Sequence, residues 1–257
     1  MPWNPVQYLK FKEERFAPFE DLCALIKIRD DLSVIDLGCG TGELTRKLAD
    51  RLTGSNIVGI DSSGQMLEQA AAFAGEGLSF SQCAVEDVAG SWDLVISNAV
   101  MQWLDNHNSL IPRLVGLVKP GGQLLVQVPS NERNPSHASI RDIASEEPFR
   151  SALGGWVRIS PVLEIDAYAS ILANAGVREV IAFEKVYSHL LPDADAVVEW
   201  TRGTTLIPYL ERLSPDLQEQ FLEHYRARLR TYWPTGPLIY TFRRTFFGGT
   251  RRDDKCR

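Results

Sequence analysis

Several features that mark other classes of protein are missing from this sequence. Its four cysteines, Cys23, Cys39, Cys83 and Cys256, lack the CxxC or Cys/His spacing of a metal site, so we expect reduced thiols and no metal. The segment Met1–Arg15 has no apolar stretch like that of a signal peptide. No apolar run approaches the ~18 residues of a membrane span. These absences predict a cytoplasmic protein with no membrane partner.

Positive charge is also scarce. The chain has 27 Lys and Arg against 33 Asp and Glu, which gives a net charge of −6. Polyanions such as DNA or tRNA favour a basic surface, so the composition disfavours a nucleic-acid partner. No obligate protein partner is evident either. With 257 residues, of which 44% are hydrophobic, the chain can bury a substantial core. It fits one enlarged α/β domain or a domain with a small cap.

Short apolar strands alternate with amphipathic helices over the first half of the chain. We expect strands at Ser33–Leu37, Asn56–Asp61, Leu78–Gln82, Trp92–Ser97 and Gln123–Val128. Helices are expected between them at Glu43–Leu52, about Gly64–Phe73 and around Leu110–Leu117. This alternation predicts an α/β fold with a doubly wound, mostly parallel sheet.

The flanking segments are mainly helical. A helix is expected after Pro18, at Phe19–Ile26, and two long strands at Val177–Leu190 and Leu238–Thr245 interrupt the helical pattern late in the chain. The expected boundaries are a helical lid over 1–30 and a sheet domain over 31–257, with helical caps at about 130–165 and 192–236.

Three glycines, Gly38, Gly40 and Gly42, follow the first strand in the pattern GxGxG. A P-loop would need a lysine after them, and none is present. A dinucleotide loop would need a third glycine where Glu43 stands, and a carboxylate there would repel a diphosphate. Asp36 adds a second negative charge. An acidic loop suits a nucleoside that carries positive charge and no phosphate, and S-adenosylmethionine has these properties.

Further polar residues lie at the ends of the next strands. Asp61 ends the second strand, where a carboxylate can bind both ribose hydroxyls. Ser62 lies beside it, and either Ser62 or Ser63 caps a helix in which Met66 can lie against adenine. Asn98 is expected where the crevice opens. Singly, Asp61 could be a helix cap and Met66 a core residue, but their joint spacing favours a cofactor site.

The motifs DLGCGTG, GIDSS, SNAVMQW and VKPGG occur in this order, and with them the chain resembles the class I S-adenosylmethionine-dependent methyltransferases over roughly Asp31–Val128. The resemblance implies a seven-stranded, Rossmann-like sheet whose last two strands, Val177–Leu190 and Leu238–Phe247, form an antiparallel pair. Nucleic-acid methyltransferases often carry an [ND]PP[YF] tetrapeptide after strand four, but SNAV stands there instead.

One departure from this class concerns adenine. Class I enzymes often place an Asp just after strand three to bind the adenine amino group, and Ala84 occupies that position here. The alternatives for this contact are Glu86, Asp87 and the backbone groups of Ala84 and Val85.

A narrower resemblance covers most of the chain. The segments WNPVQYLKFKEER, NAVMQWL, VEWTRGTTLIPYL and TFRRTFF are similar to those of the trans-aconitate 2-methyltransferases. In that group the N-terminal helix closes over the methionine end of the cofactor, which implicates Trp3, Tyr8 and Arg15. The resemblance implies methyl transfer to a carboxylate of trans-aconitate, with a monomethyl ester as product.

This reaction does not depend on general acid–base catalysis by side chains of the protein. A carboxylate with a reference pKa of about 4 is already ionised at neutral pH, so no general base and no catalytic residue are expected. Placing oxygen, methyl and sulfur in line can supply ~7–11 kcal/mol of the barrier. The alternatives are another small carboxylic acid or acyl thioester as substrate, or a module that binds S-adenosylmethionine without turnover.

The carboxylates that do not react need cationic partners, and arginine binds them with two parallel hydrogen bonds. The cationic candidates are Arg133, His137, Arg202 and either Arg243 or Arg244, of which the resemblance favours Arg244. The aromatic candidates for walls or hydroxyl donors are Tyr8, Trp103, Trp200 and Tyr209. Any single arginine among them could instead be a solvated surface residue.

Overall fold

The computed structural model describes residues 12–253, and the side chains from Phe16 onward. The predictions for Trp3, Tyr8 and the first part of the helical lid therefore lie outside the described residues. Arg15 lies within a described helix, but its side chain is outside the described part.

A seven-stranded sheet runs through the molecule in the order β3-β2-β1-β4-β5-β7-β6. Its strands are β1 Ser33–Leu37, β2 Asn56–Asp61, β3 Leu78–Gln82, β4 Trp92–Asn98, β5 Val118–Pro129, β6 Val177–Leu191 and β7 Leu238–Arg251. The pairs among β1 to β5 are parallel, whereas β7 pairs with β5 in the antiparallel sense. The predicted doubly wound, mostly parallel sheet is confirmed, and β6 and β7 are neighbours.

The helices mostly follow the predicted pattern. They are α2 Lys12–Cys23, α3 Glu43–Arg51, α4 Gly64–Ala70, α5 His107–Gly116, α6 Pro135–Ala144, α7 Phe149–Ala152, α8 Ile165–Asn174, α9 Ala194–Arg202, α10 Ile207–Leu210 and α11 Pro215–Tyr232. Short 3₁₀ turns lie at η1 Ala71–Phe73, η2 Val85–Asp87 and η3 Met101–Trp103. No helix among residues 12–253 is both long and apolar enough to cross a membrane.

Among the element boundaries that differ from the sequence expectation, two have a clear physical cause. A single helix, α2, runs across Pro18, so the prediction of a new helix beginning after this proline was wrong. The burial of Phe19 and Leu22 stabilises the helical path despite the lost backbone hydrogen bond. Strand β5 begins at Val118 rather than at Gln123, because a register shift against β4 takes the glycine-rich turn into the strand.

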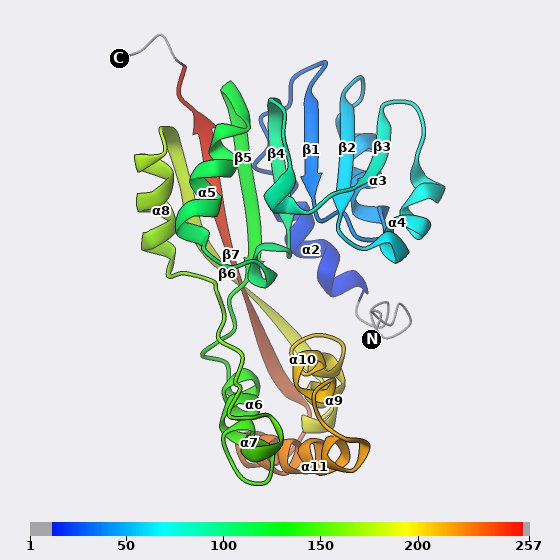
Figure 1. The fold of residues 1–257 in the computed structure, drawn as a ribbon, viewed down its shortest axis with the longest axis vertical. Helices are drawn as coiled ribbons and strands as arrows, with labels where there is room; N and C mark the ends of the chain where they lie inside the picture. Colours follow the sequence, from blue (N-terminus) through cyan, green and yellow to red (C-terminus); the bar gives the residue numbers. More distant parts are fainter. Residues whose placement is uncertain (1–11, 254–257) are drawn as a thin grey trace. The chain divides into compact units, whose positions relative to one another are not determined.

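The chain divides into two compact units. One contains residues 13–129, 161–185 and 244–253 and is called the sheet unit. The other contains residues 130–160 and 186–243 and is called the helical unit. In the sheet unit, Figure 1 shows β3, β2, β1, β4 and β5 side by side, with α5 and α8 on the near side.

Each unit has its own hydrophobic core. In the sheet unit, side chains of β1, β4, β5 and β7 pack against α5 and α8; among them are Ile111, Leu124 and Tyr168. In the helical unit, side chains of α6, α9 and α11 pack around the first half of β7; among them are Ile143 and Phe221. The lid and cap boundaries expected from the sequence stay predictions.

Candidate functional site

The sheet unit contains a point at which the strand order reverses. From β1 the chain continues outward to β2 and β3, whereas β4 lies on the other side of β1 and continues to β5. Ligands in open α/β sheets bind beside such a reversal, outside the carboxyl ends of the strands. Strand β1 ends at Leu37, directly before the three glycines, and β4 ends at Asn98. Both predicted segments therefore meet at one edge of the sheet.

The glycine loop is built from left-handed backbone. Gly42 has a φ of +77°, and a Cβ added there would lie 2.8 Å from Ala70 Cβ and from Phe80 Cζ. Gly40 also has a positive φ, +54°, but a Cβ added there would meet nothing within 4 Å. Gly42 is thus needed for packing between α3, α4 and β3, whereas Gly40 borders open space. That space is where a ligand can approach the loop backbone.

Asp61 joins the glycine loop to the start of α4. Its carboxylate accepts hydrogen bonds from the Gly40 backbone N–H at 3.0 Å and from the Ser63 N–H at 2.9 Å. Each carboxylate oxygen has two lone pairs, so both retain capacity for the hydroxyls of a ribose. Ser63 is the cap of α4, because its Oγ accepts from the Met66 N–H at 3.3 Å. Of the two cap alternatives, the structure selects Ser63.

The other hydrogen bonds of the loop join protein groups to one another and hold its backbone in place. Gly38 and Cys39 both donate their N–H groups to the Ile60 carbonyl, at 2.7 and 2.8 Å. Ser62 is exposed, and its carbonyl accepts a hydrogen bond from Gln82 Nε2 at 2.9 Å.

Two ionisable groups beneath the loop are buried. Asp36 is 5% exposed and accepts a hydrogen bond of 2.7 Å from Thr45 Oγ1. Burial raises the pKa of its carboxyl to about 6, and the negative charge of Asp61 acts in the same direction. Burial also raises the pKa of the Cys39 thiol, with Asp36 and Asp61 adding to the rise. The thiol therefore stays protonated and is a poor nucleophile.

At the carboxyl ends of β4 and β5, polar atoms lack protein partners. The buried Oδ1 of Asn98 has no hydrogen-bond partner among residues 12–253. Directly after it, Ala99 turns the chain with a φ of +57° and donates its N–H to the Gln127 carbonyl at 2.8 Å. Gln127 is 0% exposed, and both polar atoms of its amide are likewise without partners in the described part of the chain.

The sequence analysis missed Gln127, because it took Gln123–Val128 as a short apolar strand. The signal was available in principle, because a strand buried on both faces rarely carries a glutamine near its carboxyl end.

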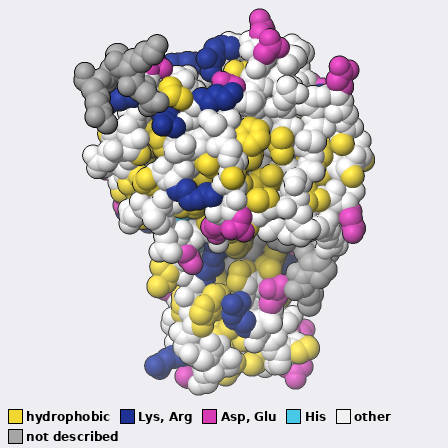
Figure 2. Space-filling view, turned by 45° about the horizontal axis from the view of Figure 1, so that its top comes forward, with side chains coloured by type: hydrophobic (Ala, Val, Ile, Leu, Met, Phe, Trp, Pro, Cys, Tyr) yellow, Lys and Arg dark blue, Asp and Glu magenta, His cyan; other side chains and the backbone are white. Residues whose placement is uncertain are grey.

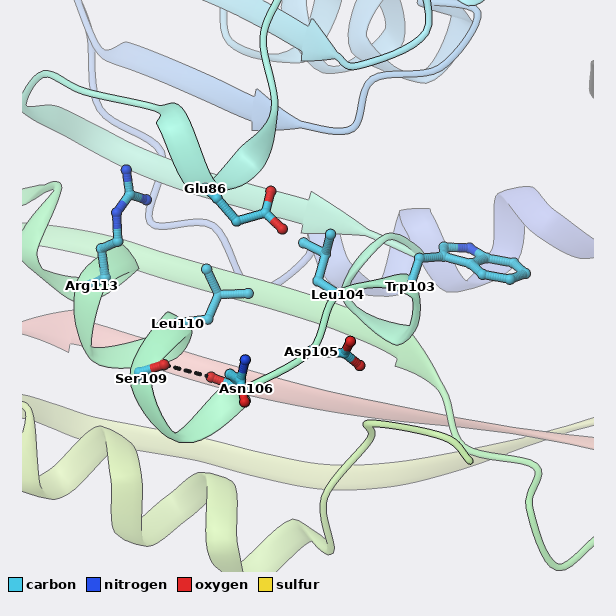
Figure 3. Close-up of a pocket in the computed structure, with 8 residues that line it drawn as sticks. All are labelled: Glu86, Trp103, Leu104, Asp105, Asn106, Ser109, Leu110 and Arg113. Carbon is cyan, nitrogen blue, oxygen red and sulfur yellow. Dashed lines mark hydrogen bonds between the residues drawn. The ribbon is translucent and has the colours of Figure 1, made fainter. Parts of the chain in front are cut away.

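A crevice of about 480 Å³ lies beside η2 and α5 (Figure 3). Its lining includes Glu86, Trp103, Asp105 and Arg113. Arg113 fixes η2 by donating to the carbonyls of Val85 at 3.2 Å and Val88 at 2.5 Å. Figure 3 shows the Glu86 and Asp105 carboxylates on the same side of Leu110. Two carboxylates there suit a ligand that donates hydrogen bonds, such as an exocyclic amine.

The adenine alternatives differ in exposure. Val85 is buried, Ala84 is half-buried, and Glu86 and Asp87 are exposed. Met66, predicted to lie against adenine, is half-buried. Of the two acidic candidates, Glu86 lines the crevice, and this favours it over Asp87 as the partner of an amino group.

Two of the predicted substrate residues belong to the sheet unit. Trp103 lines the crevice and is 40% exposed. Arg244 lies on β7 opposite Pro129 of β5 and is 9% exposed, whereas the neighbouring Arg243 is exposed. Of Arg243 and Arg244, the buried one is the one that the resemblance favoured.

Three other predicted substrate residues belong to the helical unit. His137 is buried between hydroxyls, with Nδ1 3.0 Å from Ser136 Oγ and Nε2 3.0 Å from Thr205 Oγ1. Burial, with the charges of Arg141 and Arg158, lowers its pKa to about 3, so the ring is neutral at physiological pH.

The other two helical-unit residues have protein partners as well. Arg202 lies on the surface, 3.7 Å from a Glu199 carboxylate oxygen. Tyr209 is 1% exposed, and its hydroxyl accepts the Arg158 N–H at 3.1 Å. The substrate roles of His137, Arg202 and Tyr209 stay predictions. The two further candidates in this unit are an exposed Arg133 and a buried Trp200.

Comparison with known proteins gives a consistent result. A family model described as a methyltransferase domain matches residues 28–176. The trans-aconitate 2-methyltransferase of Deinococcus radiodurans is 44% identical over 257 residues, covering 98% of this chain and 99% of the relative. Among solved structures, the YcgJ protein of Bacillus subtilis has a TM-score of 0.60 at 14% identity, covering 93% of this chain and 99% of its own.

A second solved structure was determined with a demethylated cofactor. The mycolic acid cyclopropane synthase CmaA1, complexed with S-adenosylhomocysteine, has a TM-score of 0.59 at 14% identity. The match covers 97% of this chain and 88% of the synthase. At this level of identity the likeness concerns the fold alone.

Proposed function

Because this chain belongs to the family of the trans-aconitate 2-methyltransferases, within the methyltransferase-domain proteins, we propose that it transfers a methyl group from S-adenosylmethionine to a carboxylate of trans-aconitate. The product is the monomethyl ester, and S-adenosylhomocysteine is released. The 44% identity to the relative from Deinococcus radiodurans extends over nearly the full length of both chains, and this supports the assignment.

The arrangement of Asp61 beside Gly40 carries the cofactor assignment. Gly40 borders open space, and the Asp61 carboxylate is held at that position by two backbone N–H groups. Hydrogen bonds to charged groups contribute about 1.5–3 kcal/mol each, so two ribose hydroxyls would bind firmly there. With Asp36 and Glu43 also acidic, the loop repels pyrophosphate and attracts a sulfonium. The residues present therefore fit S-adenosylmethionine.

When bound, S-adenosylmethionine supplies an activated methyl group, so that a C–O bond to the carboxylate forms as the C–S bond breaks and no proton has to move. Asp61 would orient the nucleoside, and the unpartnered Oδ1 of Asn98 would accept a hydrogen bond from the ammonium group. Glu86 would accept one from the adenine amino group.

The protonation states of the chain's ionisable groups support a mechanism in which catalysis comes from positioning the reacting oxygen, methyl and sulfur. Burial lowers the pKa of His137 to about 3, which makes its ring a weak base, and the Cys39 thiol stays protonated, so neither is poised to take up a proton or to attack in this reaction. An ionised carboxylate needs no base. Orientation and exclusion of water are what the site contributes.

Arg244 is the proposed partner of a carboxylate that does not react. It is nearly buried, and its guanidinium can bind carboxylate oxygens with two parallel hydrogen bonds. Exposed Arg243, its neighbour on β7, offers a matched control. We expect Arg244→Gln to lower kcat/KM for the acid by roughly 10- to 100-fold, given about 1.5–3 kcal/mol for charged hydrogen bonds. Arg243→Gln should change it less than twofold.

The assay that tests the function uses the purified full chain with S-adenosylmethionine. Trans-aconitate, cis-aconitate, isocitrate and citrate are supplied separately, and mass spectrometry follows the monomethyl esters. We expect trans-aconitate to be the best acceptor. Binding of S-adenosylhomocysteine without methyl transfer to any polycarboxylate would overturn the proposal and favour a binding module or another acid.

The proposed function also implies the binding partners and the subcellular localisation. The substrate is a small polycarboxylate, and the enzyme acts in the cytoplasm without nucleic acid. Cys23, Cys39 and Cys83 are free thiols, as expected in a reducing compartment. On the face drawn in Figure 2, acidic and basic side chains are interspersed.

A further inference from the structure

Two glutamines on β5 have opposite environments. Gln123 and Gln127 are four residues apart, so they project from the same face of the sheet, and both are buried. Both polar atoms of the Gln123 amide have partners: its Oε1 accepts the Lys27 N–H at 2.7 Å, and its Nε2 donates to the Leu25 carbonyl at 3.2 Å. Neither polar atom of the Gln127 amide has a partner among residues 12–253.

An unpaired amide in a protein interior opposes folding, because it loses its hydrogen bonds to water and gains none in return. At 0% exposure, Gln127 cannot recover them from bulk solvent. A side chain of similar shape without polar atoms, such as methionine, would fill the same volume without this cost. The position of Gln127 is thus better explained by a ligand than by the fold.

The strand register shows which groups share this face. Asn98 pairs with Gln127 across the parallel β4–β5 ladder, so the two side chains lie next to each other on one face. On the other side, Phe246 pairs with Gln127 and Arg244 with Pro129, which puts Arg244 on the same face, diagonal to Gln127. Diagonal neighbours lie about 7–8 Å apart, within reach of long side chains.

We propose that Gln127 binds the carboxylate of the acid substrate that receives the methyl group. Its Nε2–H₂ group donates a hydrogen bond to a carboxylate oxygen and holds the acid between the cofactor contact at Asn98 and the cationic contact at Arg244. This inference rests on the proposed function, which it deepens by naming a substrate-binding residue. The amide has both a donor and an acceptor, so it can orient a carboxylate without adding a charge that competes with Arg244.

The matched variants are Gln127→Met and Gln123→Met, each measured for thermal unfolding, S-adenosylhomocysteine affinity and kcat/KM. We expect Gln127→Met to unfold at the same or a higher temperature and to bind S-adenosylhomocysteine within twofold of wild type. Its kcat/KM for trans-aconitate should fall by roughly 10- to 100-fold, as expected for a lost hydrogen bond to a charged group.

Gln123→Met should show the reverse pattern. It leaves the Lys27 N–H and the Leu25 carbonyl unpaired, so its unfolding temperature should fall by several degrees. Its kcat/KM per folded molecule should stay within twofold of wild type.

Gln127→Glu gives a pH signature that a structural role would not produce. At pH 8 an ionised carboxylate would repel the acid, and activity should fall below that of Gln127→Met. As the pH is lowered, the introduced carboxyl takes up a proton and becomes a donor, so activity should recover relative to wild type.

The outcomes separate the two proposals. If wild type methylates trans-aconitate and Gln127→Met retains its kcat/KM, the inference is overturned and the proposed function stands. A Gln127→Met variant as destabilised as Gln123→Met, with normal activity per folded molecule, also overturns it. Wild-type inactivity on all four acids overturns the proposed function and this inference together.

Discussion

The two sides of the strand reversal satisfy their polar groups in different ways. Around β1 and β2, the Asp61 carboxylate receives two backbone N–H groups, and Asp36 receives the Thr45 hydroxyl. Around β4 and β5, Asn98 Oδ1 and the whole Gln127 amide have no partner in the described chain. The side proposed for the nucleoside is therefore preorganised by the protein, whereas the side proposed for the ammonium group and the acid is completed by its ligands.

This difference has an energetic consequence. Hydrogen bonds made within the protein fix the loop geometry before the cofactor binds, which reduces the entropy lost on binding. Unpaired buried amides do the opposite, because they lower stability until a ligand pairs with them. Mutations on the first side should therefore weaken both ligand binding and folding. Mutations on the second side should weaken activity and leave folding intact.

The largest expected effect tests the preorganised side. Asp61→Ala removes the proposed ribose contacts and also the ties to the Gly40 and Ser63 N–H groups. At about 1.5–3 kcal/mol for each hydrogen bond to a charged group, S-adenosylhomocysteine affinity should fall by roughly 100-fold or more. Titration calorimetry measures this loss, and circular dichroism tests whether the fold is retained. Unchanged affinity in a folded variant contradicts the ribose assignment.

A second prediction compares two glycines of the same loop, Gly42, which packs against protein atoms, and Gly40, which borders the space proposed for the ligand. Gly42→Ala forces a Cβ to within 2.9 Å of Ala70 Cα at a positive φ, so we expect a loss of about 3 kcal/mol in the free energy of unfolding. Gly40→Ala meets no protein atom within 4 Å and should cost only about 1–2 kcal/mol.

The cofactor affinities should not follow the stabilities. Gly40→Ala fills the space beside Asp61, so it should weaken S-adenosylhomocysteine binding although it is the more stable of the two variants. Denaturant unfolding and calorimetry on both variants provide the comparison. Equal affinity of Gly40→Ala and wild type would show that the open space is not the nucleoside site.

The geometry of the glycine loop beside Asp61 was predictable because its information is local in sequence. Gly38, Gly40, Gly42 and Asp61 lie at fixed positions relative to two consecutive strands, and parallel β1–β2 pairing brings them together. Their residue types also indicate their task, since a positive φ favours glycine and a ribose favours a carboxylate.

The other side could not be predicted in the same way. Gln127 becomes notable only once β4, β5 and β7 are paired in register and its missing partners are known. Periodicity classified its strand as apolar, because one amide hardly changes the hydrophobic pattern. Tyr209, whose substrate role stays a prediction, lies in the core of the helical unit, and its hydroxyl has a backbone N–H as partner, which the sequence pattern alone does not reveal.

A third prediction, smaller than those for Asp61→Ala and Gly42→Ala, concerns the charge beneath the glycine loop. The Asp36 carboxyl has a pKa of about 6 in the folded chain, above the ordinary value of about 4 that it has when unfolded, so between about pH 4 and 6 the folded state holds a proton that the unfolded state releases. The free energy of unfolding therefore contains a contribution that is present below pH 4 and is lost as the pH rises through 6.

Asp36→Asn keeps an acceptor for the Thr45 hydroxyl and removes this titration. Relative to wild type, it should gain about 2 kcal/mol in unfolding free energy between pH 4 and pH 7. It should also lose more affinity for S-adenosylmethionine than for S-adenosylhomocysteine, because only the former carries a sulfonium charge. Denaturant melts across this pH range measure the first effect, and paired titrations measure the second. Equal losses for the two ligands would mean that the buried charge beneath the loop does not select a cation, and the preorganised side would then act through hydrogen bonds alone.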